Sequence, residues 1–206
     1  MPLDPETGAP FPALAPAGRT ARWLADRLGG TALTGPEATK SAVIKGFARA
    51  PLIHLGTHGR AFGSEALARR SFVVLAADRA SDGLLTVADV VDSLQLDADL
   101  VVLSACETGL GNIKETEGTL GLQRAFLARG ARSVLVSLWK VDTAATDALV
   151  REFYDEWLDQ RAPRSKAEAL RGAQEKLWKE WMTGRQRGDE PLNPYWWAGF
   201  QLVGTH

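Results

Sequence analysis

The sequence predicts an α/β fold with a mostly parallel central sheet. The chain has 206 residues, of which 45% are hydrophobic and 24% charged, so it can bury one core as a single globular domain. Two short runs, Leu100–Ser104 and Ser133–Leu138, are almost wholly apolar and rich in β-branched residues, which is typical of strands covered on both faces. Strand-like and helix-like segments alternate from residue 51 onward, which favours right-handed crossovers between parallel strands.

The N-terminal quarter combines a proline-rich stretch with helical patterns. Residues 1–18 contain five prolines, and we expect an irregular lead-in there. An amphipathic helix fits Thr20–Leu28, and a brief strand is expected at Thr31–Leu33. Thr34 and Glu37 have the spacing of a capping box, so we expect them to begin a second helix. The residues of that helix that should face the core are Val43, Ile44 and Phe47.

The middle of the chain supplies strands joined by a short helical segment. Pro51–Gly56 and Phe72–Ala76 are apolar runs that predict buried strands. Gly83–Leu85 predicts a short edge strand. One or two helical turns are expected over Thr86–Leu94.

The C-terminal half alternates longer amphipathic helices with the last strands. Helices are predicted over residues 116–129 and Asp142–Trp157, because apolar residues recur there every three or four positions. Ser165 and Glu168 form a second capping-box pattern that begins a further helix. The alternating segment Tyr195–Val203 predicts the final strand. The residues that the last helix should bury are Leu170, Ala173, Leu177 and Trp181.

Composition and charge exclude several classes of function. The formal net charge is −1, so no field would hold a polyanion, and we expect no nucleic-acid partner. No apolar run approaches the roughly 18 residues that span a bilayer, and the N-terminus lacks the pattern of a secretory signal. Cys106 is the only cysteine, which fits a reducing compartment. These features predict a cytoplasmic protein that does not associate with membranes.

One histidine and the only cysteine each follow a predicted buried strand. His58 comes after Pro51–Gly56 and precedes Gly59, whereas Cys106 comes after Leu100–Ser104. Functional groups of open α/β sheets gather beyond the carboxyl ends of the strands, so neighbouring strands would bring the imidazole and the thiol together. The separation is 106 − 58 = 48 residues with the histidine first. This is close to the spacing of about 50 residues that is typical of a caspase-type dyad.

Such a pair can perform nucleophilic catalysis. A thiol beside a histidine ionises more readily, and the thiolate of Cys106 would attack a peptide carbonyl. His58 would then protonate the leaving amine. Gly59 has no side chain, so its N–H can approach the substrate closely. Together with the N–H of Cys106 it would form an oxyanion hole, with about 3 kcal/mol contributed by each donor.

The same residues also have ordinary structural interpretations. A lone cysteine after an apolar strand is often a small buried hydrophobe, and a His-Gly pair often forms a turn. Their order, their spacing and the glycines beside them together favour the catalytic interpretation. His54, in mid-strand, is expected to be a core or sheet-face residue. Arg60, Arg69 and Arg70 are expected to be solvated.

Two further segments lie near these residues in the predicted topology. Asp142 follows the next buried strand, where it can cap the following helix or form the floor of a specificity pocket that pairs with a basic substrate side chain. Gly109–Asn112 resembles a phosphate-binding loop only weakly, because it lacks the full glycine spacing and the P-loop lysine. A loop beside the substrate is favoured there over a nucleotide site. No His, Cys and carboxylate residues have the spacing of metal ligands, so no metal is expected.

Four sequence elements of the chain belong together. They are His54–Gly59, Leu103–Gly109, Gly130–Asp142 and Tyr195–Phe200, and the most specific is Ser104-Ala-Cys-Glu-Thr-Gly109. Together they resemble the CHAT domain, a caspase- and separase-related group of cysteine peptidases often attached to tetratricopeptide repeats. The similarity begins at roughly residue 14. It implies a CHAT domain over residues 19–206 after the lead-in 1–18.

The resemblance implies a fold, an activity and a set of site residues. The fold is a caspase-like three-layer α/β/α sandwich. His58 and Cys106 would form the catalytic dyad, and the amides of Gly59 and Cys106 the oxyanion hole. Because separase-like relatives favour basic residues in a deep first pocket, Asp142 is the expected selector for Arg or Lys. No cofactor is needed for this chemistry.

The resemblance also implies partners. Bacterial members similar to this chain are linked to defence systems, in which a partner activates the protease to cut effectors such as gasdermins. Besides a protein or peptide substrate, we therefore expect a regulatory partner, either a repeat-containing protein or an effector. The alternative is a catalytically silent module of the same fold that binds a peptide or scaffolds a partner domain.

Overall fold

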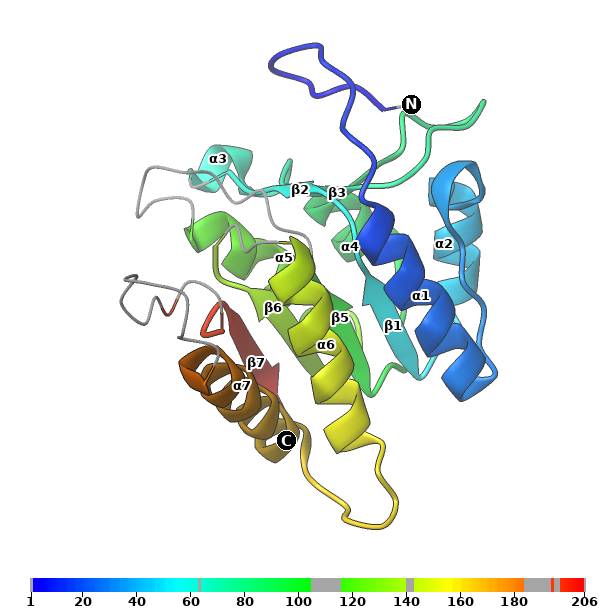
Figure 1. The fold of residues 1–206 in the computed structure, drawn as a ribbon. Coiled ribbons are helices and arrows are strands. Elements are labelled where there is room, and N and C mark those ends of the chain that lie inside the picture. Colours follow the sequence, from blue (N-terminus) through cyan, green and yellow to red (C-terminus); the bar gives the residue numbers. More distant parts are fainter. Residues whose placement is uncertain are drawn as a thin grey trace.

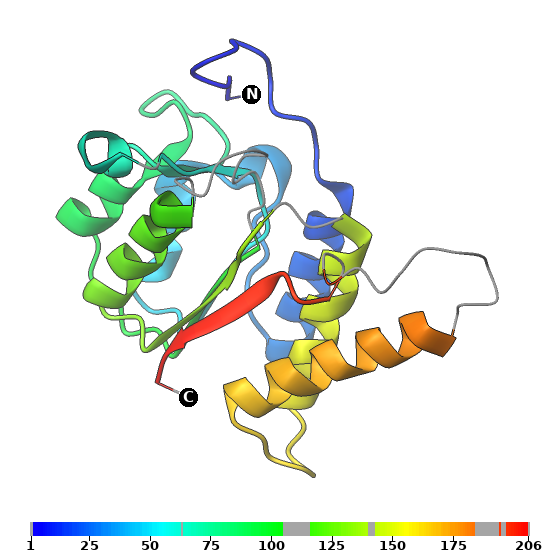
Figure 2. The same cartoon turned by 90° about the vertical axis from the view of Figure 1, so that its left-hand side faces the viewer.

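A central sheet lies between two layers of helices in the computed structural model of the chain, and Figure 2 shows the three layers side by side. A second, smaller sheet lies at the end of the molecule that also carries the N-terminus (Figure 1). The predicted three-layer α/β/α architecture with a mostly parallel sheet is therefore confirmed. The structure describes residues 2–62, 64–104, 116–139, 143–183, 194 and 197–205.

The central sheet has the strand order β1-β5-β6-β7. Its strands are β1 (Leu52–Leu55), β5 (Leu100–Leu103), β6 (Ser133–Ser137) and β7 (Phe200–Gly204). The first three are parallel, and β7 runs antiparallel to β6. Every residue of β5 and β6 is buried, as predicted for strands covered on both faces. Leu55 lies opposite Leu103, so β1 and β5 end side by side at the same edge.

Each face of the central sheet packs against its own helices. Successive residues of a strand point to opposite faces, so Val101 and Leu103 of β5 contact one layer while Leu100 and Val102 contact the other. Apolar residues of both helix layers complete the two hydrophobic cores. The first layer consists of α2 (Lys40–Phe47), α4 (Val87–Ser93) and α5 (Thr116–Ala128), and the second of α1 (Ala15–Leu28), α6 (Thr143–Trp157) and α7 (Lys166–Thr183).

The smaller sheet is antiparallel and has the order β2-β3-β4. Its strands are β2 (Gly59–Arg60), β3 (Phe72–Val74) and β4 (Leu84–Thr86), and the short helix α3 (Glu65–Ala68) lies between the first two. The strands predicted near residues 72 and 83 are therefore confirmed, but they pair with each other rather than joining the parallel sheet. The two-residue strand β2 was not predicted, because it is too short to show an alternating pattern.

Two predictions for the N-terminal quarter are wrong, one at the start of a helix and one about a strand. The helix expected at Thr20 begins at Ala15, because Pro16 occupies its first turn, where a proline lacks only an N–H that would have no helical partner. The segment Thr31–Leu33 is not a strand. The lead-in is therefore irregular only up to Leu14, apart from a single bridge between residues 3 and 10.

The capping box predicted at Thr34 and Glu37 is also wrong. Thr34 makes no side-chain cap, and Gly35–Glu37 forms only one 3₁₀ turn, η1. Gly35 has a φ of +55°, a left-handed conformation that cannot continue into a right-handed helix. The helix begins instead at Lys40, with the hydroxyl of Thr39 accepting a hydrogen bond from the N–H of Ala42 at 3.2 Å.

The second predicted capping box is confirmed, and a further one occurs on α4. The N–H of Glu168 donates to the hydroxyl of Ser165 at 3.2 Å, and the N–H of Ser165 donates back to the Glu168 carboxylate at 2.8 Å. Thr86 and Asp89 form the same reciprocal pair at the start of α4. The final strand begins at Phe200, later than predicted, and residues 195 and 196 lie outside the described residues.

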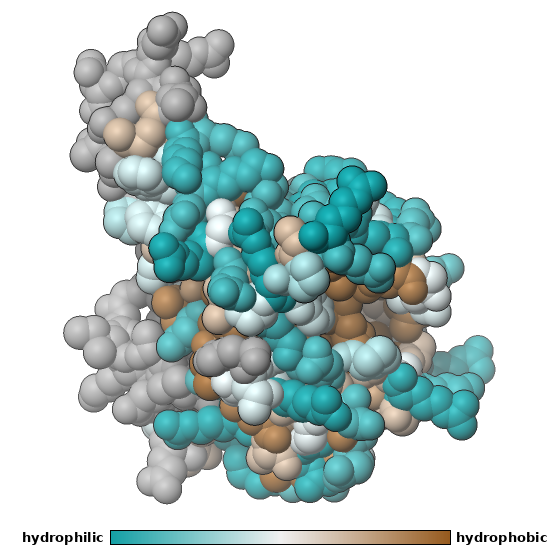
Figure 3. Space-filling view, turned by 90° about the horizontal axis from the view of Figure 1, so that it is seen from below, coloured by the Kyte–Doolittle hydropathy of each residue, from teal (hydrophilic) through white to brown (hydrophobic). Residues whose placement is uncertain are grey.

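The face of the molecule seen from below in Figure 3 is largely polar. Seen from below, hydrophilic residues cover most of it, and the hydrophobic residues form separate patches between them (Figure 3). None of the helices in the described ranges has the length and apolar character needed to cross a bilayer.

Candidate functional site

His58 lies where the chain passes from the central sheet to the smaller one. It follows the last residue of β1 by three positions and directly precedes β2. Its carbonyl accepts a hydrogen bond from the N–H of Val74 in β3 at 2.7 Å, and the hydroxyl of Thr57 donates to the carbonyl of Val74. These bonds fix the backbone on either side of the imidazole. The residue is buried, with 8% of its surface exposed.

The imidazole of His58 contacts the segment that precedes α1. Its Nε2 lies 2.8 Å from the carbonyl oxygen of Pro12. A carbonyl oxygen can only accept, so Nε2 carries the proton of this bond, and Nδ1 is the nitrogen with the lone pair in the neutral ring. The ring of Phe11 lies 5.4 Å from the His58 ring and 6.4 Å from the ring of Phe72. These contacts fix both the orientation and the tautomer of His58.

Gly59 begins the edge strand of the smaller sheet. In an antiparallel ladder, hydrogen-bonded pairs alternate with pairs that exchange no hydrogen bonds. The N–H of Val74 donates to the carbonyl of His58, so His58 and Val74 are a hydrogen-bonded pair. The next pair, Gly59 with Val73, therefore exchanges no hydrogen bonds. The N–H of Gly59 therefore points away from β3. The residue is buried although it lies at the edge of its sheet.

The ends of β1 and β5 stay joined beyond the sheet. Ser104, the first residue after β5, donates its N–H to the carbonyl of Leu55 at 3.1 Å. The two strands that precede the candidate dyad are therefore neighbours, which is the condition under which their carboxyl ends bring following residues together. Cys106 and Asp142, and the loop Gly109–Asn112, lie outside the described residues.

His54 is a half-buried residue on one face of the sheet, as predicted, and it lies on the opposite face of β1 from the first hydrophobic core. Its Nδ1 is 3.2 Å from the hydroxyl oxygen of Tyr154 on α6, and the two rings meet edge to face. Burial lowers the pKa of His54 to about 4, and burial also raises the pKa of Tyr154. Both side chains are therefore neutral at pH 7. A Cβ on Gly56 would lie 3.3 Å from His54 Nε2, so packing around the ring is close.

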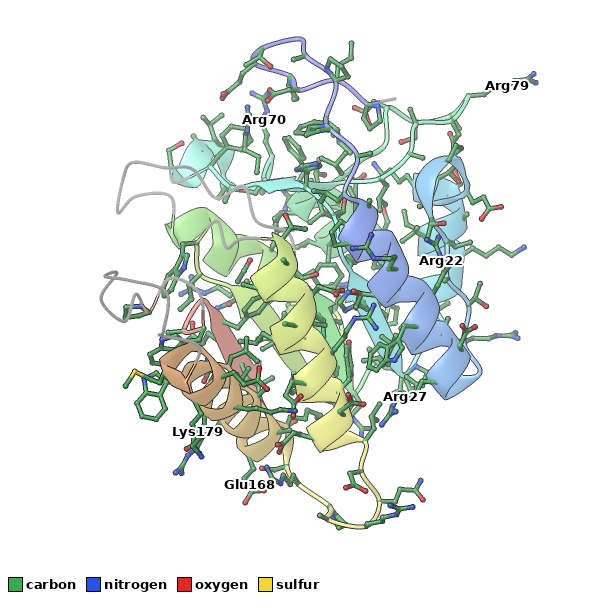
Figure 4. All side chains as sticks on the ribbon, viewed as in Figure 1. Arg22, Arg27, Arg70, Arg79, Glu168 and Lys179 are labelled. Atoms are coloured by element: carbon green, nitrogen blue, oxygen red, sulfur yellow. The ribbon has the colours of Figure 1, made fainter. Side chains whose placement is uncertain are left out.

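The prediction that Arg60 is solvated is wrong. Its guanidinium donates to both carboxylate oxygens of Asp4, and to the carboxylate of Glu6 at 2.7 Å. The side chain of Arg60 is 20% exposed, because these partners cover it. Arg69 and Arg70 are exposed as expected, and Arg70 is labelled in Figure 4.

Asp4 is nearly buried, with 8% of its surface exposed. Burial alone would raise the pKa of its carboxyl. The N–H groups of Glu6 and Thr7, together with the charge of Arg60, outweigh that effect and hold the pKa below its ordinary value. The carboxylate is therefore ionised at neutral pH and forms a bidentate ion pair with Arg60.

Sequence reasoning missed the part of the site that the lead-in supplies. Phe11 and Pro12 contact His58, and Asp4 binds Arg60, yet all three lie in a stretch that we expected to be irregular. The run Pro10-Phe11-Pro12 was the available signal, because two prolines restrict the backbone around one large apolar side chain. In the part of the chain that the structure describes, no three His or carboxylate side chains gather as metal ligands.

The comparison with known proteins agrees with this architecture. The CHAT domain family model matches residues 5–205. Tetratricopeptide repeat protein 28 of Homo sapiens is 33% identical over 215 residues, covering 88% of this chain and 8% of that protein. Its counterpart in Mus musculus is 30% identical over 214 residues with the same coverage, so the chain spans a small part of both relatives. Because the family model matches nearly the whole chain, the chain belongs to the CHAT domain family, a caspase-like group.

Proposed function

We propose that this domain is a cysteine endopeptidase that uses His58 and Cys106 as its catalytic dyad. The observation that supports this proposal most directly is the register of the parallel strands, in which Leu55 of β1 lies opposite Leu103 of β5. His58 follows Leu55 by three residues, and Cys106 follows Leu103 by three. Strands are about 5 Å apart, and three residues reach at most about 10 Å, so both groups start from one edge within reach of each other.

The tautomer of His58 supports its role as the proton carrier. Because Nε2–H is engaged by the Pro12 carbonyl, Nδ1 accepts the proton from the Cys106 thiol. The thiolate forms a bond to the substrate carbonyl carbon, and the C–N bond then breaks as Nδ1 returns the proton to the leaving amine. Water, deprotonated by the same nitrogen, hydrolyses the thioester and regenerates the thiol.

Gly59 is the proposed oxyanion donor from the described part of the site. Its N–H points away from β3, so it is directed out of the smaller sheet rather than into its ladder. With the amide of Cys106 it would stabilise the negative charge that develops on the substrate carbonyl oxygen. We further propose Asp142 as the residue that selects Arg or Lys before the cleaved bond.

A panel of fluorogenic peptides that differ only in the residue before the cleaved bond tests this function. We expect hydrolysis after Arg or Lys, loss of activity in Cys106→Ala and His58→Ala, and retained activity in His54→Gln, a control that replaces a histidine of β1 outside the site. Asp142→Asn should lose the preference for basic residues. Cleavage after Asp would reject the role of Asp142 alone, whereas activity that survives Cys106→Ala would reject the dyad.

The burial of His58 favours a second candidate, a module that binds peptides without cutting them. With 8% of its surface exposed, His58 offers little room for substrate on the side that Phe11 covers. In such a module, the wild-type domain and the Cys106→Ala variant would bind the peptides with the same affinity. Neither form would hydrolyse them. Isothermal titration calorimetry beside the hydrolysis assay separates the two functions.

The setting of the activity is proposed from the family and from the names of the relatives. Both relatives are tetratricopeptide repeat proteins by name, so we propose a repeat-containing protein as the regulatory partner. A bacterial defence or regulatory pathway, a gasdermin as effector and a cytoplasmic location stay predictions. Incubating the active domain with a purified gasdermin tests the effector, since two new fragments from a single cut are expected with wild type and none with Cys106→Ala.

A further inference from the structure

The N-terminal arm, residues 2–14, is attached to the candidate site at two points. Near its end, the carbonyl of Pro12 accepts from His58 Nε2 at 2.8 Å. Eight residues earlier, Asp4 pairs with Arg60. His58 and Arg60 are two positions apart in extended chain, so their side chains point to the same side. Figure 1 shows the arm at the end of the molecule where the smaller sheet lies.

Asp4 also organises the arm internally. Its N–H donates to the carbonyl of Ala9 at 2.8 Å, and its carbonyl accepts from the N–H of Gly8 at 2.8 Å, which closes a tight hairpin. Gly8 has a φ of +67°, as such a turn requires. The carboxylate accepts from the N–H of Glu6 at 2.9 Å and so caps the same turn. One residue therefore joins the hairpin to the strand that carries Arg60.

A stiff link connects this hairpin to the imidazole. Leu3 bridges to Pro10, and Pro10-Phe11-Pro12 then leads directly to the carbonyl that contacts His58. Proline fixes its own φ and restricts the residue before it, so the link has few conformations. Phe11 is 6% exposed and packs between the rings of His58 and Phe72. A shift of the hairpin must therefore move the Pro12 carbonyl or strain the link.

We propose that Asp4 and Arg60 are a positioning pair for the candidate site: their ion pair holds the arm so that the Pro12 carbonyl fixes His58 as the Nε2–H tautomer. This inference rests on the proposed function for its catalytic consequence, but the structural consequence stands on the geometry alone. Arg60 does not touch the reacting atoms and acts through the arm. The arm is thus a supporting element of the site and not an inhibitory cover.

The structural consequence is tested by long-range ¹H–¹⁵N NMR of the imidazole rings, which distinguishes the two ring nitrogens. The chain has three histidines, so the spectrum is readily assigned with His54→Gln and His58→Gln. Wild type should show His58 as one neutral tautomer with the proton on Nε2. Asp4→Asn, which keeps the oxygen that caps the turn but loses the charge, should give a mixture of both tautomers, as should Arg60→Gln. Arg60→Lys should be intermediate, since it keeps the charge but not the two-pronged geometry.

The catalytic consequence is tested with the best peptide substrate. Small displacements of a catalytic group can cost up to about 100-fold in rate. We therefore expect kcat to fall by about 10- to 100-fold in Asp4→Asn and Arg60→Gln while KM stays within about twofold. The matched control is Asp92→Asn, which breaks an ion pair with Arg69 at the surface. The side chain of Arg69 is 57% exposed and that of Asp92 is 58% exposed. That variant should keep both the tautomer and kcat.

The outcomes separate this inference from the proposed function. Unchanged tautomer and kcat in folded Asp4→Asn would overturn the positioning role while leaving the dyad intact. A rise in kcat would overturn it as well, since the arm would then be inhibitory. If wild type cleaves no peptide, the proposed function fails, and the NMR comparison still decides whether the ion pair sets the tautomer. Circular dichroism measures whether each variant is folded. If Arg60→Gln does not fold, Arg60→Lys replaces it in both the NMR comparison and the kinetic assay.

Discussion

Replacing His54 by Gln should make the stability of the domain less dependent on pH. His54 is neutral in the folded protein because burial lowers its pKa to about 4. In the unfolded chain it titrates near the ordinary histidine value of 6.5. Between these two values the unfolded state binds more protons than the folded state. Stability is therefore greatest above pH 6.5 and falls as the pH is lowered toward 4.

The size of this effect follows from the two pKa values. At pH 5, the unfolded histidine is almost fully protonated and the folded one is largely neutral. Through this residue alone, the free energy of unfolding is then about 2 kcal/mol lower than at pH 8. The loss approaches a limit of about 3.4 kcal/mol at lower pH, because the two pKa values differ by about 2.5 units and each unit corresponds to about 1.36 kcal/mol. Some solvent reaches the ring, so both values are upper limits.

Urea unfolding at several pH values from 8 to 5 measures this dependence. The paired carboxylates Asp4 and Asp89 have pKa values lowered below 3.8, so they lose their contribution only at more acidic pH. His58 and His206 are present in both proteins, and their effects cancel in the difference between wild type and His54→Gln. Wild type should lose up to about 2 kcal/mol more than the variant over this range. Equal slopes for the two proteins would refute the assignment of His54 as a neutral buried histidine.

Four further substitutions test the fold, one of them as a control. Gly130→Ala should destabilise the domain by at least about 1–3 kcal/mol in urea unfolding, because φ is +109° there and a Cβ would overlap the carbonyl oxygen of Leu96. Gly46→Ala is its matched control, since it lies on α2 with open space around it and should stabilise by up to about 1 kcal/mol. Thr86→Ala removes the capping box of α4 and should cost about 1 kcal/mol. Phe126→Ala should lower the free energy of unfolding by about 3–5 kcal/mol, because its side chain is fully buried, and a loss below 1 kcal/mol would contradict the assigned core.

The central sheet could be predicted because its strands are unambiguous in sequence. Leu100–Leu103 is apolar throughout and Ser133–Ser137 is apolar between its two terminal serines, and that pattern fits a buried parallel strand better than any other element. Phe72–Val74 has the same local pattern, yet it pairs in the smaller sheet. Partner choice is a property of the tertiary structure, so the run of residues alone could not reveal it. The turn at Gly35 was missed for a similar reason, since its left-handed φ is invisible in a capping-box pattern.

The candidate site could be predicted as far as its side chains carried a pattern. His58 was found because a histidine and a glycine follow an apolar run, and the neighbouring strands were then confirmed. The Pro12 carbonyl could not be found, because every residue has a carbonyl and only the fold selects this one. Asp4 and Arg60 are 56 positions apart in the sequence. Their ion pair could not be predicted, because several arginines occur in the same region and the sequence does not indicate which of them binds Asp4.

The rate of alkylation of Cys106 as a function of pH tests the proposed dyad most directly. It is the only cysteine, so iodoacetamide reports on this thiol alone. A thiol paired with His58 should react with a midpoint well below the reference pKa of about 8.5, and His58→Ala should return the midpoint to about that value. A midpoint near 8.5 in wild type, unchanged in His58→Ala, would contradict the pairing of these two residues.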